Sequence, residues 1–90
     1  MTKEGLIFKT RLDNKIKEYN DYVLESVKLL ERLLQDPNTS ATVCSDTARL
    51  CKEHMKTLRN QIGFLTSRCL YCRMPVSDFA LECVKEMRGV

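Results

Sequence analysis

The chain has 90 residues, of which 43% are hydrophobic and 30% are charged, and its formal net charge at pH 7 is +3. This composition is typical of a folded, helix-rich domain and excludes an intrinsically disordered chain. Tryptophan is absent, glycine and proline are few, and β-branched residues form no alternating run, so β-sheet is not expected. The length predicts one small domain over residues 1–90.

The sequence favours a location inside the cell. No stretch is long and apolar enough to cross a membrane. The first five residues include an acid and lack the apolar segment of a signal peptide, which predicts a cytoplasmic or nuclear protein. In a reducing compartment, the five cysteines are expected to be free thiols or metal ligands.

Residues 9–35 are predicted to form one long amphipathic helix. Thr10 and Asp13 have the spacing of a capping box at its start, and Asp36-Pro37 should end it. Apolar side chains recur at spacings of three and four, which places them on one stripe. That stripe is interpreted either as the core face of a bundle or as the seam of a coiled-coil dimer. It comprises Leu12, Ile16, Tyr19, Val23, Val27, Leu30 and Leu34.

A polar loop over residues 36–45 should let the next helix fold back antiparallel to the first. Ser45 is the expected N-cap of that helix. Its apolar stripe consists of Ala48, Cys51, Met55, Leu58 and Ile62. Gly63 has two interpretations: it ends the helix, or it is an interior glycine that costs about 1 kcal/mol while the helix continues.

A short last helix is expected after Pro75, with Ser77 as N-cap and Gly89 as its stop. Its inward face would carry Phe79, Ala80, Cys83, Val84 and Met87. The expected fold is therefore an all-α bundle, in which residues 46–90 form a part stabilised by zinc.

The zinc hypothesis depends on two pairs of side chains, Cys51 with His54 and Cys69 with Cys72. Cysteine and histidine are the ligands of structural zinc, and the second pair suggests a turn like that of a zinc knuckle. A helix break at Gly63 would let one chain bring the pairs together. An unbroken helix would hold them about 27 Å apart, and only a symmetric antiparallel dimer could then complete two sites.

Two other interpretations of these residues stay open. Cys51 and Cys69 lie near the apolar stripe, so they could be ordinary buried thiols. A redox pair formed by Cys69 and Cys72 is the weaker alternative, because no strand precedes it. Nothing in the sequence predicts a catalytic residue.

The basic residues Arg49, Lys52, Lys56 and Arg59 share one helical face. Such a face could follow a phosphate backbone, so a zinc-containing nucleic-acid-binding protein is the second functional hypothesis. A solvated helix surface explains the same spacing. Only Phe64 and Tyr71 are nearby aromatic residues for base stacking.

The favoured hypothesis is a noncatalytic protein–protein interaction module, either a self-associating adaptor or a small subunit of a larger assembly. The first helix carries apolar residues outside its main stripe, among them Ile7, Leu24 and Leu29. It is also longer than the last helix, so part of it should lack cover from its own chain and bind another helix. The expected anchors are Ile16, Tyr19, Val23, Val27 and Leu30.

Overall fold

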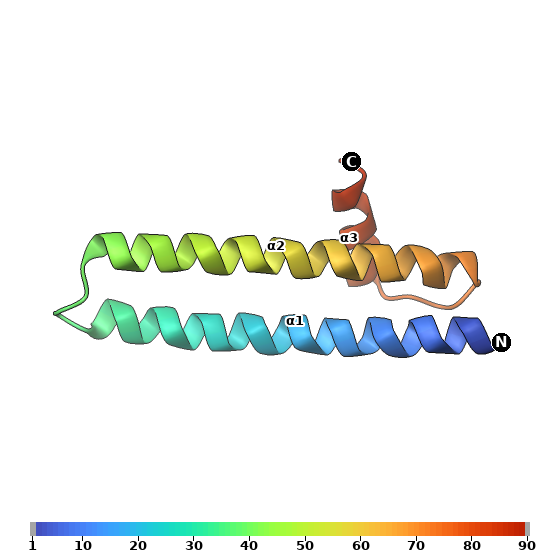
Figure 1. Cartoon of the computed structure of the whole chain (residues 1–90), viewed down its shortest axis with the longest axis horizontal. Helices are drawn as coiled ribbons and strands as arrows, with labels where there is room; N and C mark the ends of the chain where they lie inside the picture. The colour runs from blue at the N-terminus through green and yellow to red at the C-terminus, as the bar shows by residue number, and fades with distance from the viewer. Residues whose placement is uncertain (1, 90) are drawn as a thin grey trace.

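The computed structural model describes residues 2–89 and contains three helices: α1 (Lys3–Gln35), α2 (Ala41–Tyr71) and α3 (Asp78–Met87). Helices α1 and α2 lie side by side in opposite directions, and α3 crosses α2 steeply (Figure 1). The molecule is elongated, with extents of 55 × 24 × 16 Å. The expected all-α fold with an antiparallel second helix is confirmed. Within residues 2–89, no helix has the apolar length that crossing a lipid bilayer requires.

Two of the three predicted helix starts are wrong. Helix α1 begins at Lys3, because the Thr2 hydroxyl accepts a hydrogen bond from the Gly5 amide at 3.0 Å. Helix α2 begins at Ala41, where the Ser40 hydroxyl accepts from the amide of Val43 at 3.2 Å. The later caps expected at Thr10 and Ser45 lie inside helices. Thr2 and Ser40 supply the capping hydroxyls instead, so both helices begin earlier than expected.

Two other helix ends agree with the sequence prediction. Asp36, held extended before a proline, caps α1, and its carboxylate accepts a hydrogen bond from the Asn38 amide at 2.9 Å. Ser77 caps α3 by accepting from the amide of Ala80 at 3.3 Å. The connection between α1 and α2 is therefore a short turn over residues 36–40.

Each of the two long helices carries a row of buried and half-buried residues spaced by seven. On α1 it runs through Gly5, Leu12, Tyr19, Ser26 and Leu33, and on α2 through Cys44, Cys51, Leu58, Leu65 and Cys72. All ten positions are buried or half-buried. Full burial of a leucine contributes about 1.5–3 kcal/mol, so Leu12 and Leu58 are the most stabilising residues of the repeat.

Gly63 lies inside α2, and α3 packs directly on it. A Cβ atom at Gly63 would be 2.9 Å from the Cys83 carbonyl oxygen and 2.5 Å from the Met87 sulfur. The interior interpretation of this glycine is therefore the one observed. The missing side chain lets the α3 backbone approach, and the contact completes a core of Leu12, Ile62, Cys69, Met74, Ala80 and Cys83.

Candidate functional site

The four predicted zinc ligands all lie on or at the end of one continuous helix. Cys51 and Cys69 are buried, Cys72 is half-buried and His54 is exposed. Eighteen residues of helix separate Cys51 from Cys69, a distance of about 27 Å. The structure therefore does not bring the two pairs together. Among residues 2–89, no three Cys, His, Asp or Glu side chains form a group able to hold a metal ion.

The segment expected to form a zinc-knuckle turn is instead the capped end of α2. The amide of Met74 donates to the Cys69 carbonyl at 2.9 Å, and the amide of Arg73 donates to the Leu70 carbonyl at 3.0 Å. These two bonds define a Schellman motif. Its left-handed position is occupied by Arg73, with φ of 58°. The backbone amides of this turn are thus directed at carbonyl oxygens.

The buried thiols are poorly suited to ion binding or redox chemistry in this conformation. Burial raises the pKa of the Cys69 thiol, and burial also raises the pKa of Cys83. Both effects favour the protonated thiol, whereas zinc ligands and redox cysteines need the thiolate. The interpretation of Cys69 as a small core residue agrees with this environment.

His54 and Cys51 meet a residue of α1 that the sequence did not single out. The rings of Tyr22 and His54 pack edge to face, with centroids 4.4 Å apart. Burial raises the pKa of the Tyr22 hydroxyl, and a side-chain hydrogen bond with Cys51 adds to the increase. Cys51 and His54 therefore help to hold α1 against α2. No local pattern in the sequence singled out Tyr22.

Arg59 of α2 contacts residues of both α1 and α3. Its guanidinium donates two hydrogen bonds to the Glu86 carboxylate, at 2.8 and 2.6 Å, and one to the Tyr19 hydroxyl at 3.2 Å. It also lies 5.1 Å from the centre of the Phe79 ring. This arrangement holds the pKa of the Glu86 carboxyl below its usual value. These contacts of Arg59 join residues that are distant in the sequence, so no local pattern predicted them.

The four basic residues of the predicted nucleic-acid face therefore lie in different environments. Arg59 points into the contact with α3, and Arg49 lies between Asp46 at 3.8 Å and Glu53 at 3.6 Å. Lys52 and Lys56 are exposed. Two lysines make a small electrostatic footprint for a phosphate backbone. The structure therefore adds no support to the nucleic-acid hypothesis.

The predicted partner-binding residues are largely occupied within the chain. Ile16 and Tyr19 pack against the core, and Val23 and Leu30 are half-buried. Val27 is exposed. Ile16 and Tyr19 therefore offer a partner only part of their surface.

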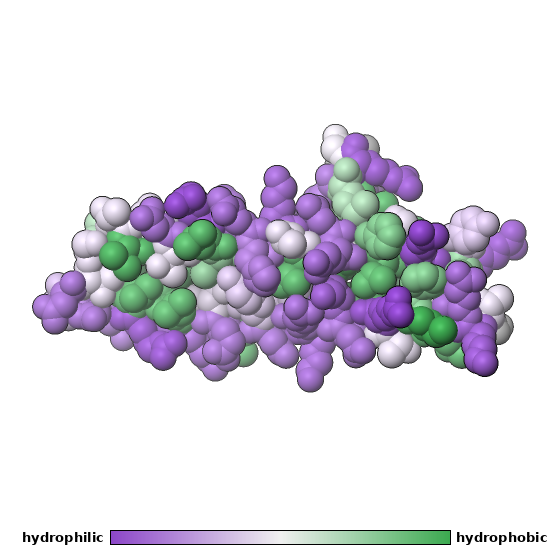
Figure 2. Space-filling view, in the orientation of Figure 1, coloured by the Kyte–Doolittle hydropathy of each residue, from purple (hydrophilic) through white to green (hydrophobic). Residues whose placement is uncertain are grey.

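A different apolar surface is free. Helix α3 covers only the part of the hairpin that lies away from the 36–40 turn, and we call residues 20–56 the uncovered half. In this half, only Ser26 and Cys51 are buried. Figure 2 shows hydrophobic residues at that end of the molecule and also around α3. The exposed large apolar residues of the uncovered half are Leu24, Val27, Leu29, Leu34, Val43 and Leu50.

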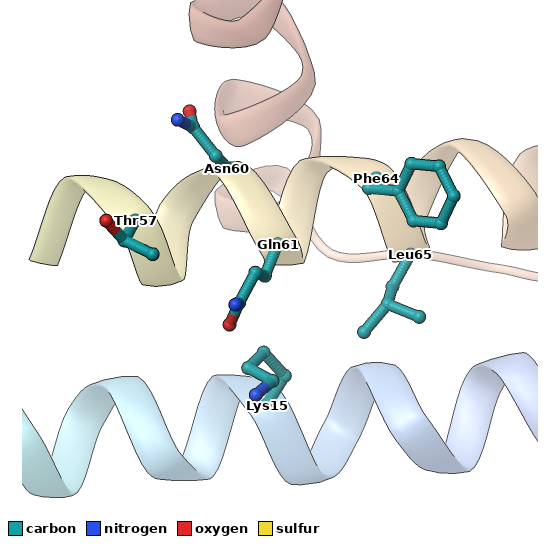
Figure 3. Close-up of a pocket in the computed structure, with 6 residues that line it drawn as sticks. All are labelled: Lys15, Thr57, Asn60, Gln61, Phe64 and Leu65. Atoms are coloured by element: carbon teal, nitrogen blue, oxygen red, sulfur yellow. The ribbon is translucent and has the colours of Figure 1, made fainter. Parts of the chain in front are cut away.

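A shallow hollow of about 450 Å³ lies between α1 and α2, on the side facing the viewer in Figure 3, with α3 behind. Gln61 and Leu65 point toward α1, and Lys15 points back toward α2. The Lys15 ammonium pairs with Glu18 at 2.9 Å. The remaining lining residues are Thr57, Asn60 and Phe64. The Thr57 hydroxyl donates a hydrogen bond to the Glu53 carbonyl oxygen at 3.2 Å, so Thr57 and Lys15 are each engaged by a residue of their own helix.

Comparison of the chain with protein-family models, with curated proteins and with solved structures finds no match.

Proposed function

We propose that this protein is a noncatalytic interaction module that binds another protein helix. The observation that carries the proposal is the contrast between the two ends of the hairpin. Under α3 the three helices share a buried core, whereas in the uncovered half only Ser26 and Cys51 are buried and six large apolar side chains are exposed. A helix pair of this kind gains stability when a further helix buries those side chains.

The proposed mode of binding is coiled-coil-like packing of a partner helix along the uncovered half. Burial of apolar surface contributes about 25 cal/mol per Å² to the free energy of binding, so the expected partner is a helix with an apolar face. The Arg59 contacts fix the two helices at the end that α3 covers, and the uncovered half extends from that fixed end. A self-associating adaptor and a subunit of a larger assembly both use such a surface.

Cross-linking of the tagged chain in cell extract tests this proposal. Lysine-reactive cross-links to a protein are expected at Lys28 and Lys52, which lie in the uncovered half. They should disappear when Val27 and Leu50 are both replaced by Glu. Replacing Leu6 and Ile7 by Glu provides the matched control, because these residues are similarly exposed at the other end of α1. Absence of cross-links at Lys28 and Lys52, or their persistence in the first variant, would refute the proposal.

The structural zinc ion stays a separate prediction. His54 and Cys72 are the donors that an ion could reach most easily, whereas Cys51 and Cys69 would have to leave the core. Native mass spectrometry with added zinc gives a direct measurement. A bound ion that is lost in the Cys72→Ser variant would support the site. Binding unchanged by Cys72→Ser would rule out the proposed ligand set.

A further inference from the structure

The hairpin of α1 and α2 has two faces, and the contact of Tyr22 with His54 tells them apart. Tyr22 follows Tyr19 of the α1 repeat by three positions, and His54 follows Cys51 of the α2 repeat by three. The two rings are in contact, with centroids 4.4 Å apart, so the positions three after the repeats share one face of the hairpin. Positions three and four after a helical residue flank it on opposite sides. The positions four after the repeats therefore share the other face.

Helix α3 packs on this second face, which we call the α3 face. Ile62, four residues after Leu58, shares the buried core with Ala80 and Cys83 of α3. Gln61, three residues after Leu58, lines the hollow that has α3 behind it (Figure 3). The contacts of α3 thus agree with the assignment of faces from the Tyr22–His54 contact.

The α3 face continues beyond α3 as an apolar strip along the uncovered half. On α2, Met55 and Ala48 precede Ile62 by seven and fourteen residues, and positions seven apart stay on one side of a helix in a supercoiled pair. On α1, Val23 and Leu30 each lie four residues after a member of the repeat. These four side chains are half-buried or exposed. We call the surface that they form with their α1 neighbours the free strip, which consists of Val23, Val27, Leu30, Leu34, Ala48 and Met55.

A basic edge borders the free strip on α2. Lys52 and Lys56 precede Arg59 and Gly63 by seven residues, so they lie on the side of α2 that α3 contacts further along. Helix α3 meets that side with an acid, because the Glu86 carboxylate accepts two hydrogen bonds from the Arg59 guanidinium. Lys52 and Lys56 are exposed, and neither forms an ion pair with another of residues 2–89. The basic position that Glu86 occupies is therefore repeated beside the free strip without its acid.

We infer that the partner helix lies in the free strip and carries acidic residues along one edge of its apolar face, where they pair with Lys52 and Lys56. This inference rests on the proposed function and adds the contact face and the chemistry of the partner. Val27 and Leu34, which are 46% and 73% exposed, border the strip on α1, so the other edge of the partner helix is apolar. Helix α3 is the precedent within the chain, since it joins an apolar face to the acid Glu86.

Two synthetic helical peptides of about 20 residues test the charge requirement. Both carry leucine on one face, and they have either glutamate or lysine along one edge of that face. Fluorescence anisotropy with up to about 500 µM protein measures their binding. The wild-type chain should bind the acidic peptide at least about tenfold more tightly, because two lysines meet opposite charges.

The double variant Lys52→Glu, Lys56→Glu should reverse this preference. Lys17→Glu, Lys28→Glu is the matched control, because these lysines are also exposed but lie on α1. The control changes the net charge of the chain by the same amount, so an effect of overall charge would appear in both variants. We expect the control to keep the preference for the acidic peptide.

Two exposed leucines of the uncovered half test the face. Leu34→Asn, in the free strip, should weaken binding of the acidic peptide about tenfold, because a leucine side chain is buried on binding. Leu50 precedes Thr57 of the hollow by seven residues, so it lies on the face away from α3. Leu50→Asn should therefore change binding less than about twofold, although Leu50 is 58% exposed. Circular dichroism confirms that each variant is folded.

Several outcomes would overturn the inference. These are a preference for the acidic peptide that persists in Lys52→Glu, Lys56→Glu, a loss of binding in Leu50→Asn instead of Leu34→Asn, and absence of binding by either peptide. Tighter binding of a DNA duplex of about 20 base pairs, lost in Lys52→Glu, Lys56→Glu, would assign the basic edge to a phosphate backbone instead. In each of these cases, the cross-links at Lys28 and Lys52 decide separately whether the chain is an interaction module.

Discussion

Replacing Gly63 with alanine is expected to destabilise the protein, although alanine is the better helix former. In an exposed helix interior, this substitution would add about 1 kcal/mol to the free energy of unfolding. Here the new methyl group would meet the Cys83 carbonyl oxygen at 2.9 Å and its carbon at 3.1 Å. These are backbone atoms, so relief requires α3 to move away from α2.

The magnitude follows from the two opposing effects. Overpacking costs about 1–3 kcal/mol, and the upper end applies because the obstacle is backbone rather than a flexible side chain. Subtracting the gain in helix propensity leaves a net loss of about 2 kcal/mol. For a domain of this size, that loss lowers the Tm by roughly 10 °C.

Gly5→Ala is the matched control for this experiment. Its methyl group would meet the Met74 sulfur and the Thr2 hydroxyl, both at 3.1 Å, and these side chains can shift by a few tenths of an ångström. We expect a change within about 1 kcal/mol of wild type. Thermal and urea unfolding followed by circular dichroism at 222 nm measures both variants. If Gly63→Ala raised the Tm as a helix interior predicts, the close approach of α3 to Gly63 would be refuted.

Three further predictions concern the turn, the ion pair and the thiols. Arg73→Gly should raise the free energy of unfolding by about 1 kcal/mol, because glycine adopts a φ of 58° without steric cost. Urea titration measures this change, and a loss of stability would contradict the turn geometry. The Arg59–Glu86 pair lowers the carboxyl pKa, so its stabilisation is present above the ordinary glutamate pKa and lost as pH falls through the lowered value. Urea midpoints at pH 7 and pH 3 should therefore differ more for wild type than for Glu86→Gln, and equal differences would exclude a stabilising pair. The buried Cys69 and Cys83 should react with a thiol reagent only as the protein unfolds, and labelling of either at the native rate of Cys44 would contradict their burial.

The helices could be predicted from periodicity, but their starts could not. The stripe through Leu12, Ile16 and Tyr19 was visible because burial against one neighbour imposes a regular spacing. Ser40 and Ser45 are both good caps, and the local sequence does not rank them. Only the N-cap at Ser77 was placed correctly from the sequence.

The predicted metal site shows how one pattern can have two physical origins. Cysteines spaced by three resemble half-sites for zinc, but Cys51 and Cys72 also occupy the seven-residue repeat that faces α1, where a small apolar side chain fits. Choosing between these origins required knowing whether the helix continues through Gly63. Continuation of the helix depends on α3 packing on Gly63, and α3 comes from a distant part of the sequence. The contact of Arg59 with Glu86 also joins distant residues. Neither contact leaves a local signal in the sequence.

The one-sided placement of α3 implies a gradient of local stability along the hairpin. Near the 36–40 turn, opening the helices exposes few buried groups, so transient separation there should cost much less than global unfolding. Amide hydrogens of Leu30 and Cys44 should consequently exchange with solvent much sooner than those of Leu58 and Ile62. The two long helices would then stay together at the end that α3 covers and separate transiently at the other end. Binding of a second helix would reduce that separation.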